Sequence, residues 1–429
     1  MDKSPLHEDL PLVVSTFFLV LALTRQLQAS LAWGHESWNM TEWLINYSGG
    51  FVRRGLSGEA VSLISALTHV PANLVVVILS VAIYALTLHL LVCKVGGAVP
   101  LAVMLSPIAM GAPAYEEFVV RKDVLGILLL FVCLQLSARP GNRLGKHILV
   151  NVVTCSAILM HESFGFFGLP ALIAFNACAG RDDRGPAFSR LGWSGLALAP
   201  AILAFAAVLF FHGDHQTAVA INSHWRDLWV TVDPEGCHLD TPCVDTPWAA
   251  IDALQWSLSR TVSLNASLLG AFSAGIYVPL AWLLTAIACY YFLLQFLRIG
   301  TNEGEHSSTA LDQERVRLSS ILLSQLVLMA PLFVVGWDFG RWIFLWTASS
   351  ITLFAFGYDP SRMLPGLFNR VSSSVVRRLP LAARPNPWYL LLIGIPGCCW
   401  GIESFFASSP IGYFANVIFE ASQVMVAGS

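Results

Sequence analysis

The amino-acid sequence predicts an all-α protein, a polytopic bundle of about eleven transmembrane helices. Of its 429 residues, 56% are hydrophobic and only 12% are charged, and the mean hydropathy is +0.66. A soluble domain carries roughly 25% charged residues. Apolar runs of spanning or near-spanning length also recur along most of the chain, which is typical of a membrane protein. We therefore expect a single integral membrane domain over residues 1–429, with residues 213–273 as an external loop within it.

Eleven apolar runs predict the helices in chain order. A full span takes about 20 residues, so the shorter runs need polar groups inside the protein to cap their ends. Residues 57–69 read as a short amphipathic helix lying in the membrane interface. The eleven runs are residues 11–33, 70–93, 97–112, 124–138, 148–160, 164–179, 191–211, 276–297, 318–336, 343–357 and 388–407.

The stretch 148–179 decides the topology. Two helices with a turn at residues 161–163 place most Lys and Arg side chains, including those of the loop 358–387, on one side. The positive-inside rule makes that side cytoplasmic. We therefore expect an inner or plasma membrane protein with a cytoplasmic N-terminus and its active face external. Cys237 and Cys243 then lie in an external loop, where they are expected to form a disulfide.

The first of four charged clusters is residues 46–59, NYSGGFVRRGLSGE, in the loop that follows the first apolar run. Arg53 and Arg54 are permanent cations whose planar fork suits phosphate or carboxylate. The glycines in this run permit tight turns and close approach of a ligand to the backbone. We interpret the run as an anion-binding loop at a membrane face. The alternative is an ordinary loop whose arginines touch lipid head groups.

The second cluster is residues 115–123, YEEFVVRKD. Glu117 and Arg121 are four residues apart and would pair on a helix. Charges beside an apolar span are costly unless they line a wet cavity. The functional interpretation gives Glu116 or Glu117 a role in proton transfer and Arg121 or Lys122 a contact with phosphate. The alternative is a self-neutralising group of ion pairs at a helix end.

The third cluster is His161 and Glu162 at the expected turn. A helix over residues 148–160 covers only about 20 Å, which is less than the ~30 Å hydrocarbon core. Both side chains would then lie below the outer surface, where ionisable groups usually face a bundle interior or a cavity. Partial burial is expected to raise the pKa of Glu162 towards neutrality, which favours it as general base. His161 would share or relay the proton.

The fourth cluster is residues 337–342, WDFGRW. Trp337 and Trp342 fit an interfacial aromatic belt, and Asp338 and Arg341 are spaced to pair. Burying each charged cluster separately against lipid would be expensive. We therefore expect all four clusters to converge on one outer cavity.

Several kinds of site have no motif in the sequence. It contains no phosphate-binding P-loop, no dinucleotide-binding glycine pattern, no DxD or HExxH motif and no heme-type CxxCH. This disfavours cytosolic nucleotide chemistry and metalloprotease activity. We expect no metal site, no cofactor and no nucleic acid partner, and leave a divalent cation open.

The arrangement resembles the polytopic glycosyltransferases of the GT-C class. In that class an external loop after the first helix carries catalytic carboxylate chemistry, an interfacial helix follows, and a charged cluster lies between the third and fourth helices. The match covers residues 1–180, where the run 113–130, PAYEEFVVRKDVLGILLL, is similar to a stretch of the class. The first loop departs from the class, because it offers Glu36, Glu42 and Glu59 but no Asp and no acidic pair. The runs 46–59 and 337–342 look like those of uncharacterised bacterial membrane proteins tied to surface polysaccharides.

The resemblance implies transfer of a sugar from a polyprenyl-phosphate-linked donor to a glycan or lipid-linked acceptor at the outer face, with membrane lipids as further partners. Such chemistry needs cations for the leaving phosphate and a carboxylate that takes a proton from the acceptor hydroxyl. The expected catalytic residues are Glu162, His161, Glu117 and Glu59, and the expected substrate-binding residues are Arg53, Arg54, Arg121, Lys122, Asp338, Arg341, Glu42 and Trp337.

Two other functions use the same residues. An O-antigen-like polysaccharide polymerase or ligase would bind two lipid-linked substrates with the same arginines. A transporter or flippase for lipid-linked saccharides would use His161 and Glu162 as a proton relay. A transporter is expected to show an internal repeat, and the sequence shows none.

The topology can be tested with single cysteines in otherwise cysteine-free protein. In intact cells, an impermeant thiol reagent should label a cysteine at Asn265 and spare one at Arg370, because the first lies in the expected external loop and the second in the expected cytoplasmic loop. The reverse labelling pattern would contradict the two-helix topology.

Overall fold

The computed structural model describes a chain built from helices. The described residues are 6–32, 37–116, 118–140, 142–179, 186–226, 249–271, 277–298, 308–336, 338–363, 368–382, 385–396 and 402–427, and no strand occurs among them. The all-α prediction is confirmed for this part of the chain. The expected disulfide between Cys237 and Cys243 lies outside the described residues.

The first half of the chain contains the helices that carry the charged clusters. They are α1 (Leu6–Ala32), α2 (Trp38–Leu44), α3 (Gly55–Thr68), α4 (Ala72–Val95), α5 (Leu101–Met104), α6 (Ala112–Tyr115), α7 (Asp123–Ala138), α8 (Arg143–Met160), α9 (Ser163–Ala179), α10 (Ala187–Ala197), α11 (Ala199–Phe210) and α12 (His215–Arg226).

The second half continues with helices of more variable length. They are α13 (Ala249–Asp252), η2 (Ala253–Gln255), α14 (Leu258–Ala271), α15 (Tyr277–Phe296), α16 (Ser308–Val335), α17 (Phe339–Ala355), η3 (Pro360–Arg362), α18 (Phe368–Arg378), η4 (Pro387–Leu391), α19 (Ile402–Ala407) and α20 (Pro410–Ala427).

Three helices are long and apolar enough to cross a membrane by themselves, over Leu10–Leu31, Ala72–Val95 and Thr309–Val335. The bent pair α10 and α11, with 71° between its halves, makes a fourth if it counts as one span. Several other expected runs form shorter apolar helices, among them α7, α8, α9 and α15. Within the described residues, the helices of spanning length are therefore fewer than the eleven expected.

Two expected helices are wrong. Residues 97–112 form only the single turns α5 and α6, joined by tight turns. Gly96 and Gly97 have positive φ, and Pro100 and Pro107 lack the N–H that a helix interior needs. The run 388–407 is likewise divided between η4 and α19. The helix α20 was not among the expected helices.

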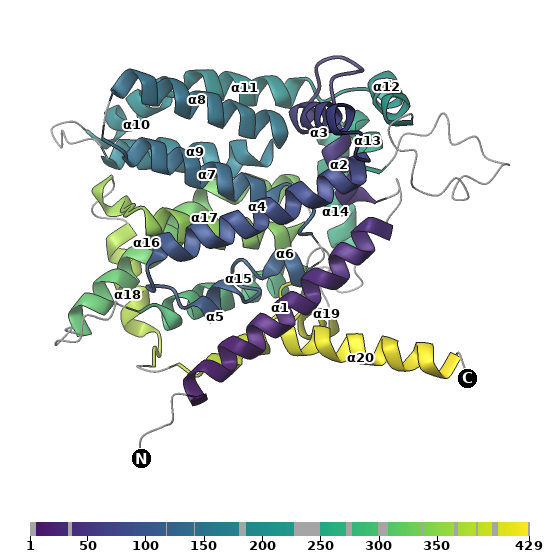
Figure 1. Ribbon diagram of the computed structural model, residues 1–429. Helices are drawn as coiled ribbons and strands as arrows, with labels where there is room; N and C mark the ends of the chain where they lie inside the picture. The colour runs from purple at the N-terminus through teal and green to yellow at the C-terminus, as the bar shows by residue number, and fades with distance from the viewer. Residues whose placement is uncertain are drawn as a thin grey trace. The chain divides into compact units, whose positions relative to one another are not determined.

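The chain divides into two compact units. Unit 1 contains Met1–Gln26, Leu88–Glu117 and Asn265–Ser429, and unit 2 contains Leu27–Thr87 and Phe118–Leu264. In unit 1, α16 packs against both α17 and α18, and Leu19, Ala22, Leu105, Ala114 and Tyr115 form a buried apolar cluster. In unit 2, α8 packs between α7 and α11, and α9 packs against α7 and α10 (Figure 1).

Unit 2 also packs the short helix α2 against α3 through two glycines. A Cβ atom at Gly58 would lie 2.1 Å from Ile45 O, and one at Gly55 would lie 2.2 Å from the Tyr47 ring. The close approach lets Gly58 N–H donate to Ile45 O at 3.1 Å. The sequence suggested that the glycines of the 46–59 run leave room for a ligand; at these two positions they leave room for the chain itself.

The substitution Gly58→Ala should lower the free energy of unfolding by about 1–3 kcal/mol, the usual effect of overpacking a tight contact. Gly192→Ala is the matched control, because Gly192 also lies in a helix and nothing lies within 4 Å of its added Cβ. Alanine there should be neutral or stabilising. Thermal unfolding in detergent would measure both, and an unchanged Tm for Gly58→Ala would contradict the packing.

Candidate active site

Two adjacent arginines lie where the 46–59 run enters α3. Arg54 directly precedes the helix and has a left-handed backbone, with φ +67°. This conformation is costly for a residue with a Cβ atom, and such strain tends to occur at functional sites. Arg53 is fixed by its N–H, which donates to Phe211 O at 3.0 Å, and by Nη2, which donates to Ala253 O at 3.0 Å.

The break between α8 and α9 supplies two more charged or polar side chains. The helix α8 ends at Met160 and α9 begins at Ser163, which confirms the expected turn. Ser163 N–H donates to His161 Nδ1 at 3.1 Å, and Phe164 N–H donates to His161 O at 3.1 Å, so the break satisfies its own backbone groups. The helix α8 starts at Arg143 and has 18 residues, which gives about 27 Å and not the ~20 Å expected.

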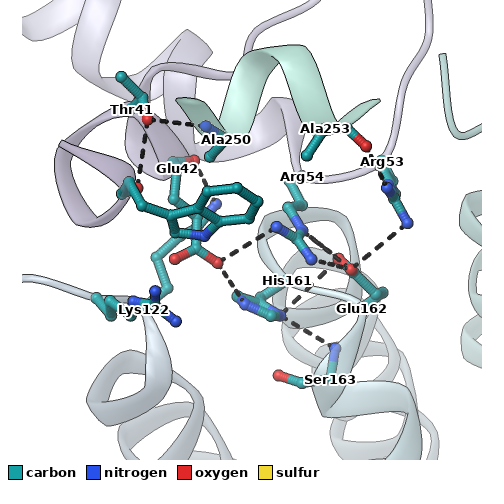
Figure 2. Close-up of polar contacts among 12 residues, drawn as sticks. Thr41, Glu42, Arg53, Arg54, Lys122, His161, Glu162, Ser163, Ala250 and Ala253 are labelled. Atoms are coloured by element: carbon teal, nitrogen blue, oxygen red, sulfur yellow. Dashed lines mark hydrogen bonds and ion pairs between the residues drawn. The ribbon is translucent and has the colours of Figure 1, made fainter. Parts of the chain in front are cut away.

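Arg54 binds Glu162 in a two-pronged contact (Figure 2). Its Nε lies 2.7 Å from Oε2, and its Nη2 donates to Oε1. The flat guanidinium matches the flat carboxylate, which is the strongest common geometry for this pair. Arg53 Nη1 lies 4.0 Å from the same Oε1. Arg54 and Glu162 are 16% and 12% exposed, so water weakens the contact little.

Glu42, on α2, is the most deeply buried carboxylate of the group, with its side chain 1% exposed. Its Oε1 lies 2.6 Å from His161 Nε2 and 3.6 Å from Arg54 Nη1. These contacts are both to Oε1, and the second carboxylate oxygen, Oε2, has no hydrogen bond to any described residue. A buried carboxylate normally accepts hydrogen bonds at both oxygens. Glu42 therefore keeps acceptor capacity in the interior of unit 2.

The hydrogen bond to His161 Nδ1 identifies the tautomer of the ring. Because Ser163 N–H donates to Nδ1, this nitrogen carries no proton, and the single ring proton is on Nε2. Nε2–H therefore faces Glu42, and His161 is neutral in this arrangement. The ring orients Glu42; it has no free lone pair with which to act as a base itself.

The pKa of Glu162 differs from the expectation. Burial alone raises it, but the charge and hydrogen bonds of Arg54 outweigh burial and hold the pKa well below the usual range. The expectation that burial brings Glu162 towards neutrality is therefore wrong, because it did not include the bound guanidinium. For Glu42, burial again raises the pKa, and His161, Arg54 and Lys122 lower it below the usual range.

Lys122 occupies a different place from the one expected. It directly precedes α7, is 1% exposed, and donates from Nζ to Glu42 O at 2.8 Å and to Ser57 Oγ at 3.0 Å. Ser57 Oγ in turn donates to Arg54 O at 3.1 Å. The ammonium group is therefore hydrogen-bonded to protein atoms, and it is not accessible to a phosphate. Lys122 connects the backbone of Glu42 with the backbone of Arg54.

Other expected site residues lie apart from this group. Glu59 Oε1 accepts a hydrogen bond from Tyr47 N–H at 2.7 Å, which stabilises the loop. Arg121 Nε donates to Asn39 Oδ1. Glu116 ends α6 in unit 1.

The fourth cluster belongs to unit 1, where Arg341 Nη1 lies 2.5 Å from Asp338 Oδ2. Glu117, Trp337 and Glu36 lie outside the described residues. The structure thus brings together parts of the first, second and third clusters, in unit 2, and convergence of all four stays a prediction. No group of three or more His, Cys, Asp or Glu side chains suited to a metal occurs in the described part of the chain.

Residues 249–255 support the site, although few features of the sequence indicate this. The helix α13 packs against α2, and Ala250 N–H donates to Thr41 Oγ1 at 3.2 Å. The segment lies within the expected external loop 213–273, in which no site residue was expected. Its signal was the short apolar run AAIDAL inside otherwise polar sequence, which is too short for a membrane span and fits a buried turn.

The sequence pattern of a family described as "Uncharacterised membrane protein Rv1490" matches residues 12–231. This is more than half of the chain, which therefore belongs to that family. Together with the apolar helices, the match identifies an integral membrane protein. The matched range contains Glu42, Arg54, Lys122 and Glu162 and ends before Asp338. No curated protein and no solved structure matches the chain.

Lys122 gives a test of this geometry through pH. Burial lowers its pKa to about 7, and the nearby carboxylates offset only part of that effect. Between pH 7 and the ordinary lysine pKa of about 10.4, the unfolded chain binds a proton that the folded chain does not. Stability therefore rises with pH in this window. The Tm of the wild type should therefore rise relative to the Tm of Lys122→Met as pH rises from 7 to 10.

Lys94→Met is the control, because Lys94 is exposed. Its Tm difference from wild type should stay constant over the same pH range. A constant difference for Lys122→Met as well would show that the ammonium group is not buried as described.

Proposed function

We propose that this member of the Rv1490 family is a membrane glycosyltransferase that moves a sugar from a polyprenyl-phosphate-linked donor to a glycan or lipid-linked acceptor at the outer face. The observation that carries the proposal is the buried Glu42 carboxylate. It is oriented by His161, lies beside Arg54, and its Oε2 has no hydrogen bond to a described residue. The GT-C class, which the arrangement of residues 1–180 resembles, carries catalytic carboxylate chemistry in the first external loop, and Glu42 lies in that loop.

Glu42 is the general base in this mechanism. It accepts the proton of the acceptor hydroxyl as the acceptor oxygen bonds to the anomeric carbon of the donor sugar. The bond between that carbon and the phosphate oxygen breaks, and the polyprenyl phosphate leaves with the electron pair. Glu42 lies on α2, in the first loop after α1, whereas Glu162 is committed to Arg54. The role of base therefore moves from Glu162 to Glu42.

Arg53 is the first contact for the donor phosphate. It is the most exposed charged side chain of the group, at 21%, and its Nε has no hydrogen-bond partner among the described residues. Arg54 is the second contact, because a phosphate can share its guanidinium with Glu162. Charge from the phosphate offsets the attraction of Arg54 for Glu42 and so raises the pKa of Glu42. Donor binding thereby makes Glu42 a better base.

The test is transfer of labelled sugar from polyprenyl phosphate in proteoliposomes, with donor binding measured separately. Glu42→Gln should keep donor binding and lower turnover by roughly 10²–10⁴-fold, the usual effect of losing a general base. Arg53→Ala and Arg54→Ala should weaken donor binding and turnover together. Glu314→Gln, a partly exposed carboxylate of unit 1 paired with Arg317, is the control and should behave as wild type.

Two results would contradict the mechanism. Normal turnover in Glu42→Gln would exclude Glu42 as the base and return the role to Glu162 or Glu117. Absence of transfer from every lipid-linked donor, with donor binding preserved, would favour the transporter for lipid-linked saccharides.

A further inference from the structure

Two tryptophans lie beside the charged group of unit 2. Trp38 is the first residue of α2, and Trp256 directly follows η2. Their ring centroids are 6.1 Å apart, with the ring planes tilted by 52°. The guanidinium of Arg260 lies over the Trp256 ring, 5.0 Å from its centroid. Both indoles are half-buried, and Arg260 is exposed.

Both tryptophans are connected to the proposed reacting groups. Trp38 and Glu42 are four residues apart on α2, so they lie on the same side of that helix, separated by about 6 Å along its axis. The backbone N–H of Trp256 donates to Ala253 O at 3.2 Å, and the same carbonyl accepts the hydrogen bond from Arg53 Nη2 at 3.0 Å. One indole is thus placed next to the base and the other next to the phosphate contact.

An interfacial aromatic belt does not account for this pair. Belt tryptophans anchor a protein in the head-group region and expose their rings to lipid. Trp193 on α10 fits that description, since it is 70% exposed and its helix has no buried residue. Trp38 and Trp256 differ from it in being half-buried, in contact with each other, and attached to the backbone of the charged group.

We propose that Trp38 and Trp256 form a saccharide-binding subsite that receives the acceptor, with Arg260 as its polar edge. The inference rests on the proposed function and commits the acceptor to a sugar hydroxyl. The C–H face of a sugar ring is weakly positive and packs against the negative face of an indole. The guanidinium of Arg260 offers hydrogen-bond donors to ring hydroxyls. A ring held there presents a hydroxyl towards Glu42, one helical turn away.

The experiment measures binding of methyl glycosides to the full chain in a sugar-free detergent. A panel of methyl glycosides of common hexoses and pentoses serves as the probe, with binding followed by saturation-transfer NMR. For the tightest glycoside, Trp38→Ala and Trp256→Ala should each raise Kd about tenfold, the order expected for losing one aromatic contact. Trp38→Phe and Trp256→Phe should restore part of the affinity. Trp193→Ala is the matched control and should leave Kd unchanged.

Binding of a fluorescent polyprenyl phosphate separates this inference from the proposed function. The Kd for polyprenyl phosphate should be the same in Trp38→Ala, Trp256→Ala and wild type. Equal binding would also show that the two variants are folded. Equal glycoside affinity in wild type, Trp38→Ala and Trp256→Ala would overturn the subsite. The subsite would also be overturned if no glycoside binds while polyprenyl phosphate still binds through Arg53 and Arg54. In that case the proposed function would stand. Failure of polyprenyl phosphate to bind would overturn both.

Discussion

Arg54 lies between two buried carboxylates, and the arrangement of unit 2 around the site depends on this contact. Glu162 comes from the break between α8 and α9, and Glu42 comes from α2. Each would be expensive to bury alone. The guanidinium binds one of them in two-pronged geometry and lies 3.6 Å from the other. Its position requires a left-handed backbone at the start of α3, and the two packing glycines of that helix let the loop approach closely enough.

The charges of the group nearly cancel. The group contains three cationic side chains and three anionic ones: Arg53, Arg54 and Lys122, and Glu42, Glu162 and Asp123. The ring of His161 is neutral in the assigned tautomer. In the proposed function, the donor phosphate adds negative charge to this balanced group, which favours the uptake of protons. Lys122, whose pKa lies near 7, and Glu42 are the groups that can take them. Under the proposed function, donor binding is therefore expected to be accompanied by proton uptake at these residues.

Local patterns predicted much of the fold and part of the site. The long apolar runs predicted most of the long helices. The polar pair at residues 161–162 predicted the break between α8 and α9, because ionisable groups are costly within an apolar helix. The paired arginines stood out for the same reason. The helix predicted over residues 97–112 was wrong, because a hydropathy pattern does not take into account the prolines that prevent a helix.

The roles of individual charges could not be predicted from local patterns. Glu42 is one of several acidic residues in the first loop, and only the tertiary contacts with His161 and Arg54 distinguish it. Glu162 looked like a base because burial was foreseen and its arginine partner was not. Lys122 looked like a ligand contact, although its side chain reaches a carbonyl of α2 and a hydroxyl of α3. Such roles depend on residues far apart in the sequence.

The contact between Arg54 and Glu162 also affects how much of the protein accumulates in the membrane. The two residues reach the membrane on different segments and can pair only once both segments are in place. A chain that lacks either partner retains a buried charge that nothing compensates, a defect that typically costs about 3–5 kcal/mol. Losses of this size reduce the amount of protein that escapes proteolysis. Natural variants that lose either partner are therefore expected to be scarce in the membrane, and loss of Arg54 is expected to be the more severe because Glu42 also lies beside it.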